Sequence, residues 1–143
     1  MIDFEYLNKA DFCLYAQIVF DILSGNMTII APTGNSYEED YKMWYSAVSG
    51  GLQKAERQII LIKDNENVVG YFQYYINEDT FMMEEIQFKP EYQGKGIFRK
   101  LYGFVLENIN QEHPMQVRLC LLRGCLKNTN IRQCTDIKAR SKA

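Results

Sequence analysis

A glycine-bearing segment between residues 88 and 101 carries the residue types that could hold a phosphate-bearing ligand. Gly94 and Gly96 have no Cβ, so main-chain N–H groups could approach an anion closely there. Apolar periodicity predicts that a helix follows, and the first turn of a helix offers unpaired donors and the positive end of its dipole. Lys95 and Arg99 add positive charge around the same turn. The segment predicts a site for a pyrophosphate, with an ordinary helix start bearing solvated cations as the alternative.

Other chemistries find few suitable residues in this chain. The spacing of the glycines fits neither the dinucleotide fingerprint nor the P-loop. The only histidine, His113, directly precedes Pro114, so hydrolases that use a histidine base are set aside. No metal site and no disulfide framework are expected, because the four cysteines form no CxxC pair. They are Cys13, Cys120, Cys125 and Cys134.

The elements that must position the glycine segment follow from hydrophobic patterning. Apolar residues at helical spacing predict helices over about 12–25, 37–49 and 97–110, the second opened by a capping box of Ser36 and Glu39. Runs of β-branched and aromatic residues predict strands over 58–62, 68–76, 81–88 and 116–122. The order predicts an α/β fold with a mixed sheet, in which a three-strand antiparallel meander precedes a strand-helix-strand unit. The last strand would then lie parallel beside the third.

Length and composition predict one domain over residues 1–143. Hydrophobic residues make up 47% of the chain and charged residues 24%, which are ordinary globular proportions. No apolar run approaches about 18 residues and no signal-peptide pattern opens the chain, so we expect a soluble cytoplasmic protein with no membrane partner. Residues 114–143 carry a net charge of +6 and residues 1–113 of −8, which sum to −2. Nucleic acid is not an expected partner, because no aromatic residues interleave the basic tail.

In this setting the segment resembles the coenzyme A binding motif of the GNAT superfamily of N-acetyltransferases, Gln/Arg-x-x-Gly-x-Gly/Ala. The motif begins at Gln93, and a strand, Pro90 and Tyr92 precede it as in the family. Phe98 departs from the pattern, because it stands where the family has Gly or Ala. The resemblance covers roughly residues 1–122 and implies a GNAT-like acyl-CoA N-acyltransferase fold.

The resemblance implies direct transfer of an acetyl group from acetyl-CoA to a primary amine of a small molecule or peptide. The main chain of the strand before the motif would hold the pantetheine arm, and the loop would hold the pyrophosphate. The residues implied for the coenzyme are Ile86, Gln87, Phe88, Gln93, Gly94, Lys95, Gly96, Ile97, Phe98, Arg99 and Asn128.

The site must desolvate the acceptor amine or supply a base, because an amine with a pKa of about 10.4 is mostly protonated at neutral pH. Glu84 and Glu85 are the candidates, on the strand that leads into the motif. In a regular strand they point to opposite faces, so only one would face the cleft. Parity with Ile86 favours Glu84, and a β-bulge of the kind common in GNAT sheets would exchange the two. A structural role for either carboxylate is the alternative.

The C-terminal tail, residues 123–143, departs from the family. Asn128 matches an asparagine of the family, but seven residues later stands Thr135 in place of a tyrosine that protonates the leaving thiolate, and no tyrosine follows Tyr102. A natural truncation, a tail completed by a partner subunit in a homodimer, and an altered reading frame remain open. The second hypothesis is therefore a catalytically impaired GNAT-like module that binds coenzyme A or a protein partner.

Overall fold

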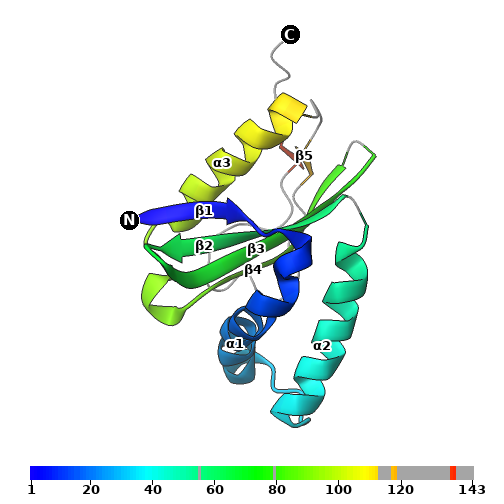
Figure 1. Ribbon diagram of the computed structural model, residues 1–143. Coiled ribbons are helices and arrows are strands. Elements are labelled where there is room, and N and C mark those ends of the chain that lie inside the picture. Colours follow the sequence, from blue (N-terminus) through cyan, green and yellow to red (C-terminus); the bar gives the residue numbers. More distant parts are fainter. Residues whose placement is uncertain (55, 79, 113–116, 119–135, 138–143) are drawn as a thin grey trace.

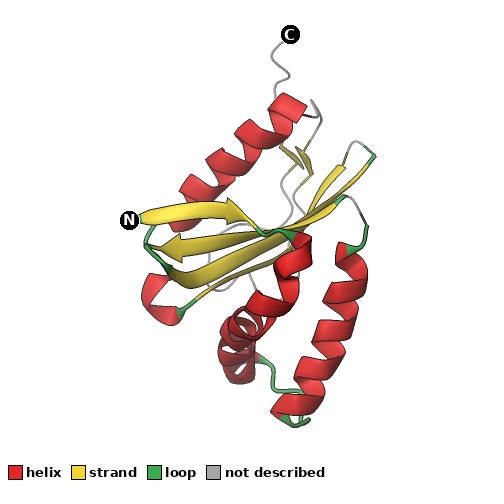
Figure 2. Cartoon of the chain, in the orientation of Figure 1, coloured by secondary structure: helices red, strands yellow, loops and turns green. Residues whose placement is uncertain are grey.

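The computed structural model describes residues 1–54, 56–78, 80–112, 117–118 and 136–137 (Figure 1). Its helices and strands are shown in Figure 2. In chain order they are β1 (Ile2–Tyr6), η1 (Lys9–Asp11), α1 (Phe12–Ile30), α2 (Tyr37–Leu52), β2 (Arg57–Asp64), β3 (Asn67–Asn77), β4 (Thr80–Phe88), η2 (Pro90–Tyr92), α3 (Ile97–Glu112), β5 (Val117–Arg118) and β6 (Asp136–Ile137).

The main sheet has the strand order β1-β2-β3-β4, and every neighbouring pair in it is antiparallel. The predicted meander of three strands is therefore confirmed, and the extended N-terminal segment adds β1 beside β2. The expected parallel pair does not occur among the described residues, where β5 pairs antiparallel with β6. Most of the predicted strand 116–122 lies outside the described part of the chain.

Helices cover both faces of the sheet, and the sheet separates the core into two clusters (Figure 1). On one face, Ile97, Leu101 and Val105 of α3 pack against alternate strand residues such as Ile60 and Phe72. On the other face, α1 and α2 pack against the intervening strand residues, among them Tyr71. This alternation is the strand periodicity of two that the sequence pattern predicts. The mixed α/β fold is confirmed.

Helix α1 runs further than its apolar pattern predicted. The helix was expected to end near Gly25, yet it continues to Ile30. Gly25 lies in the open, where an added Cβ would meet nothing within 4 Å, so it neither packs nor terminates the helix. By length and composition Lys9–Ile30 is also apolar enough to cross a membrane, contrary to the expectation that no segment is. Core helices of soluble proteins meet the same criterion, and Ala16 and Val19 are fully buried against the sheet.

Helix α2 opens with the predicted capping box. The Ser36 hydroxyl accepts from the Glu39 amide, and the Glu39 carboxylate accepts from the Ser36 amide. The helix ends at Leu52, slightly beyond its predicted end. Tyr37, in its first turn, donates a hydrogen bond to Asp21 of α1. This bond raises the pKa of Tyr37 to about 12, since the proton is shared with a carboxylate. The two helices are thereby joined at their exposed side as well as in the core.

Candidate active site

The loop predicted to bind an anion, residues 93–99 and called the anion loop below, follows β4 and η2 and leads into the first turn of α3. Gly94 and Gly96 adopt φ angles of +70° and +76°, which lie in the left-handed region that favours glycine. A Cβ at either position would meet nothing within 4 Å, so the loop has open space in front of it. Lys95 and Arg99 are exposed on either side of Gly96. The residues predicted to bind an anion therefore lie together, with main chain accessible from solvent.

The first turn of α3 packs its apolar side chains into the core, and a glycine precedes its first residue. Ile97 is buried in the core cluster beneath the sheet. Gly96, directly before it, has no side chain that could cap the first amides of the helix. Phe98, the residue that departs from the family pattern, packs against the same core cluster and stacks on Tyr102, with the ring centroids 6.1 Å apart. Burial raises the pKa of Tyr102. The first turn is thus fixed by packing while its N–H groups stay available to a ligand.

The approach to the loop is tied to the sheet at two points. The Lys89 amide donates to the Val69 carbonyl at 2.8 Å. The Tyr92 hydroxyl donates to Asp64 at the end of β2, also at 2.8 Å. That hydrogen bond, with the N-terminal amino group 3.0 Å from the same carboxylate, lowers the pKa of Asp64 and raises that of Tyr92. The segment that leads into the loop is therefore held to the sheet by hydrogen bonds.

The Gln93 side chain turns inward, away from the open side of the loop. Its Nε2 donates to the Phe88 carbonyl at 3.1 Å and to Oδ1 of Asn26 in α1 at 3.4 Å. The Asn26 amide nitrogen donates to the same Phe88 carbonyl and to Gln87 Oε1, each at 2.8 Å. Gln87 Nε2 in turn donates to Glu85 Oε1 at 2.7 Å. A line of amides therefore runs from the loop to a candidate catalytic carboxylate.

Asn26 is the residue of this network that the sequence interpretation missed. It is 5% exposed and lies within a helix, where a buried polar side chain needs partners. The signal was present, because the apolar stripe of α1 passes through positions 12, 16, 19 and 23 and next reaches position 26. Ending the helix near Gly25 hid this asparagine.

A β-bulge decides where the two candidate carboxylates lie. Gln73 of β3 pairs with Glu85 and Tyr74 pairs with Met83, so Glu84 is an extra residue that has no paired residue on β3. Glu84 Oε1 accepts from Gln73, which lies on the face covered by α1 and α2, and Glu85 is linked through Gln87 to α1. Both carboxylates therefore lie on the same face, and the expectation that only one could do so is wrong. The bulge removes the alternation on which that expectation rested.

The two carboxylates have different partners. Glu84 Oε1 accepts from Arg57 Nε at 2.5 Å and from Gln73 Nε2 at 3.3 Å, so it belongs to an ion pair that is about one-fifth exposed on each side. The Arg57 guanidinium also lies over the Tyr75 ring, 4.9 Å from its centroid. Glu85 instead accepts from the neutral amide of Gln87. Glu84 is thus held by a cation, and the amide line reaches Glu85, which has a further interaction as well.

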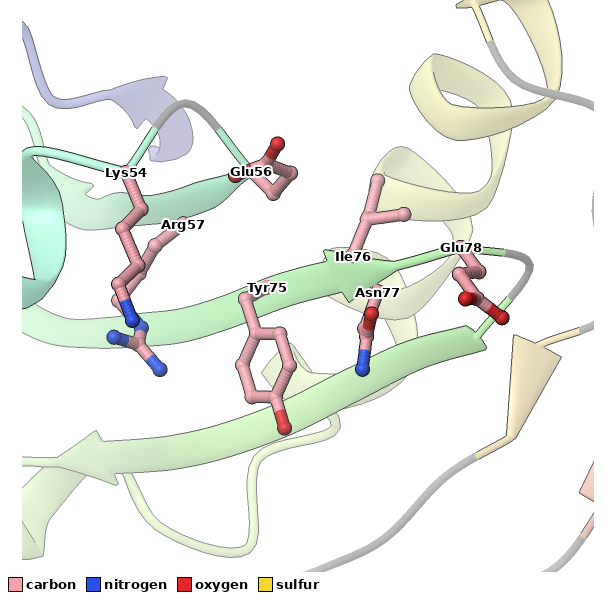
Figure 3. A pocket seen from close by; sticks show the side chains of 7 residues that line it. All are labelled: Lys54, Glu56, Arg57, Tyr75, Ile76, Asn77 and Glu78. Atoms are coloured by element: carbon pink, nitrogen blue, oxygen red, sulfur yellow. The ribbon is translucent and has the colours of Figure 1, made fainter.

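Two cavities flank this region on the α1 and α2 side of β4. One, of about 460 Å³, lies at the β3–β4 hairpin end, where Lys54, Arg57 and Tyr75 are among its lining residues (Figure 3). The other, of about 330 Å³, lies between α1 and the end of β4, and Asn26 and Lys89 are among its lining residues. The carboxylates therefore lie along a strand with a cavity near each end.

Comparison with known proteins decides the family. The sequence profile of the Acetyltransferase (GNAT) family matches residues 17–122. The chain belongs to the GNAT family of acetyltransferases. The match includes α1 from Gln17 onward, the carboxylate and amide positions described above, and the whole loop. No curated protein sequence matches the chain.

Solved GNAT structures share the fold. A GNAT family acetyltransferase from Brucella melitensis, in complex with acetyl-CoA, is 14% identical, with a TM-score of 0.61 over 95% of this chain and 88% of that one. A ribosomal-protein-alanine N-acetyltransferase from Brucella melitensis biovar Abortus 2308 is 17% identical, with a TM-score of 0.63 over 90% and 86%. An aminoglycoside acetyltransferase, meta-AAC0020 from an uncultured soil metagenomic sample, in complex with sisomicin, is 13% identical, with a TM-score of 0.65 over 85% and 78%.

Membership of the GNAT family confirms the resemblance that the sequence predicted, together with the fold class. The binding and catalytic roles of individual residues stay predictions. Among them, Ile86 to Phe88 lie on β4, the last strand of the described sheet, and Gln93 to Arg99 lie beyond its end. Asn128 and Thr135 lie outside the described residues, as does the atypical tail apart from residues 136–137. Within the described part of the chain, no group of three or more His, Cys, Asp or Glu side chains could hold a metal.

Proposed function

We propose that this GNAT protein transfers the acetyl group of acetyl-CoA directly to a primary amine of a small molecule or peptide. The observation that carries the proposal is the open loop between β4 and α3, with two left-handed glycines, the second of which directly precedes the first residue of the helix. Such a loop presents several main-chain donors to one anion, which suits the diphosphate of a coenzyme. Exposed Lys95 and Arg99 add charge attraction from solvent.

The coenzyme would lie along the edge of β4 that faces away from β3; the described residues of β5 contact β4 but do not pair with it. The described sheet ends at β4, so main-chain groups of Ile86 and Gln87 can face the pantetheine arm on the side away from β3. The Phe88 carbonyl is an exception, because it already accepts from the Asn26 and Gln93 side chains. The Gln93 side chain would support the loop from within, and its contribution to the diphosphate would come through the main chain.

Glu85 is our candidate for the general base, in preference to Glu84, which parity had favoured. Glu84 holds Arg57 in an ion pair, and both of its hydrogen bonds converge on one oxygen. Glu85 is oriented by a neutral amide and lies on the same face of the sheet. In the proposed reaction the acceptor ammonium gives a proton to Glu85, and its nitrogen attacks the thioester carbonyl carbon. The carbon–sulfur bond then breaks, and a second proton passes from that nitrogen through water to the leaving thiolate, which releases coenzyme A as the thiol.

The acceptor would enter from the 460 Å³ cavity beside the bulge. Arg57 lines this cavity and also pairs with Glu84, so cavity and carboxylates are neighbours (Figure 3). The lining bears Lys54 and Arg57 as well as Glu56 and Glu78, which suits a polar acceptor. The similar structures include a ribosomal-protein-alanine N-acetyltransferase and an aminoglycoside acetyltransferase, so both acceptor types belong in the test panel.

Calorimetry with acetyl-CoA and a thiol-release assay test the proposal. The panel contains an aminoglycoside, a peptide with an N-terminal alanine and an aliphatic diamine. We expect the wild-type chain to bind acetyl-CoA and to release thiol with at least one amine. Glu85→Gln should lower kcat by about 10²- to 10⁴-fold, the usual contribution of a general base, and leave the Kd of acetyl-CoA near the wild-type value.

Glu84→Gln is the matched control, because it removes the neighbouring carboxylate and keeps its shape. We expect it to retain most of kcat while loosening Arg57. A reversed ranking of the two variants would reassign the base to Glu84. Binding of acetyl-CoA with no turnover on any amine would contradict the transferase assignment and favour a coenzyme-binding module. Absence of binding would contradict the loop assignment itself.

A further inference from the structure

A line of three amides connects the anion loop with Glu85, and Asn26 of α1 is its central member. We propose that Asn26 is a positioning residue that couples coenzyme binding at the loop to the orientation of the Glu85 carboxylate. The proposal rests on the function proposed above, because it takes Glu85 as the group that receives the acceptor's proton. It assigns a catalytic consequence to a side chain that would touch neither coenzyme nor acceptor.

The first half of the coupling follows from which groups can donate. An ionised carboxylate only accepts hydrogen bonds, so Gln87 must present its NH₂ group to Glu85, as it does at 2.7 Å. The side-chain carbonyl oxygen of Gln87 then faces Asn26, so the Asn26 NH₂ group must donate to it, as it does at 2.8 Å. The charge on Glu85 therefore fixes the orientation of both amides. Conversely, the orientation of Asn26 determines which end of Gln87 faces Glu85.

The second half of the coupling reaches the loop. The Phe88 carbonyl also only accepts, and both Asn26 and Gln93 donate to it, at 2.8 and 3.1 Å. This leaves Asn26 Oδ1 to accept from Gln93 Nε2 at 3.4 Å, the longest link of the line. Two fixed acceptors at opposite ends thus impose the same direction on all three amides. A movement of Gln93 with the loop would be transmitted to Gln87 through a single side chain.

The burial of Asn26 supports a positioning role over simple packing. It occupies a position on the apolar stripe of α1 where a leucine would bury more apolar surface. The side chain is 5% exposed and Gln87 is 3% exposed, so water does not screen or replace their hydrogen bond. A buried amide with its donors and acceptor used in one direction specifies geometry that an apolar side chain cannot.

Asn26→Asp tests the direction of the line with almost no change of shape. An aspartate here would only accept, so Gln87 would have to turn its NH₂ group toward it and its carbonyl toward the Glu85 carboxylate. We expect the Kd of acetyl-CoA to rise by about tenfold, because the Phe88 carbonyl loses its Asn26 donor and faces a carboxylate oxygen in its place, while Gln93 can still donate to that carboxylate. We expect kcat to fall by about tenfold or more, and its acid limb to move to higher pH, because Glu85 loses a donor to its charged form.

Asn26→Leu is the second variant, in case a buried aspartate prevents folding. It keeps the branched shape of the side chain, although it is larger, and removes the amide, so both parameters should change in the same direction without the reversed orientation of Gln87. Asn108→Leu is the matched control, because Asn108 is also a helical asparagine whose amide donates a hydrogen bond, but its acceptor is the Phe104 carbonyl of its own helix α3, at 2.7 Å and away from the site. Circular dichroism and thermal unfolding establish that each variant is folded. The control should leave Kd, kcat and the pH profile unchanged.

A double-mutant cycle separates coupling from a general loss of order. If Asn26 acts through Gln87, the effect of Asn26→Leu on kcat should largely disappear when Gln87→Leu is already present. Its effect on the Kd of acetyl-CoA should remain in that background, because the loop is reached through Gln93. Additive effects on kcat, or a pH profile of folded Asn26→Asp that matches the wild type, would overturn the proposal. A wild-type chain that neither binds nor transfers would instead overturn the proposed function.

Discussion

The two left-handed glycines of the anion loop allow a quantitative prediction. A residue with a Cβ costs about 1–2 kcal/mol in this region of backbone conformation, and Gly94 and Gly96 have φ angles of +70° and +76°. An alanine would meet no atom within 4 Å, so the penalty is conformational and not steric in the free protein. If the loop keeps its shape, the free energy of unfolding falls by that amount.

The alternative is that the substituted loop relaxes and acetyl-CoA must restore it. The same 1–2 kcal/mol then appears in binding, as an increase in Kd of about 5- to 30-fold. The two losses are complementary, so their sum for Gly96→Ala should be about 1–2 kcal/mol in either case. Urea unfolding of the free protein and calorimetry with acetyl-CoA measure the two parts. An additional loss in binding would show that the Cβ also occupies space needed by the coenzyme.

Gly34 provides the matched control. It lies between α1 and α2, has a φ angle of +82° and also has open space around its would-be Cβ. Gly34→Ala should lose similar stability, yet bind acetyl-CoA as tightly as the wild type. Our reasoning fails if Gly94→Ala and Gly96→Ala both retain wild-type stability and wild-type Kd. It fails equally if Gly34→Ala weakens acetyl-CoA as much as they do.

Two further predictions concern the frame that holds the loop. Gly70→Ala should lower the free energy of unfolding, measured in urea, by about 1–3 kcal/mol, because its Cβ would lie 2.6 Å from the Gln87 carbonyl oxygen. Gly50→Ala should instead raise the free energy of unfolding by about 0.5–1 kcal/mol, because Gly50 lies in helix α2 with open space around its would-be Cβ. Asp64 has a pKa lowered from 3.8, so its stabilising contribution is present above that pH and lost as the pH falls through the lower folded value. Unfolding of the wild type and Asp64→Asn should therefore differ by a constant amount above pH 4 and converge below it, and a difference that grows on acidification would contradict this sign.

Local chemistry in the sequence was sufficient for most of the frame. The capping box formed because Ser36 and Glu39 satisfy each other's amides whatever the rest of the chain does. The meander formed because three β-branched and aromatic runs are joined by short polar turns. The anion loop was predictable for the same reason, since Gly94 and Gly96 permit a backbone conformation that few other residues adopt.

Features that depend on partners distant in sequence were beyond prediction. The end of α1 was placed too early, because Gly25 resembles a helix stop unless the side chains around it are known. Asn26 is satisfied by Gln87 and by the Phe88 carbonyl, more than 60 residues away. Neither partner is visible in the helical pattern itself, so a polar residue on an apolar stripe looked like the end of the stripe.

The bulge in β4 changes what a pair of adjacent glutamates can do. With regular alternation, one carboxylate would serve the site and the other would face the α3 side, and sequence parity would choose between them. The inserted residue places both on the face of α1 and α2, where α2's neighbour Arg57 takes Glu84 and the amide line from α1 takes Glu85. Strand parity therefore no longer decides which carboxylate is the base; the partners that β2 and α1 supply to each carboxylate do. Substitutions at Asn26 and Arg57 should therefore affect different carboxylates, although Glu84 and Glu85 are adjacent in the chain.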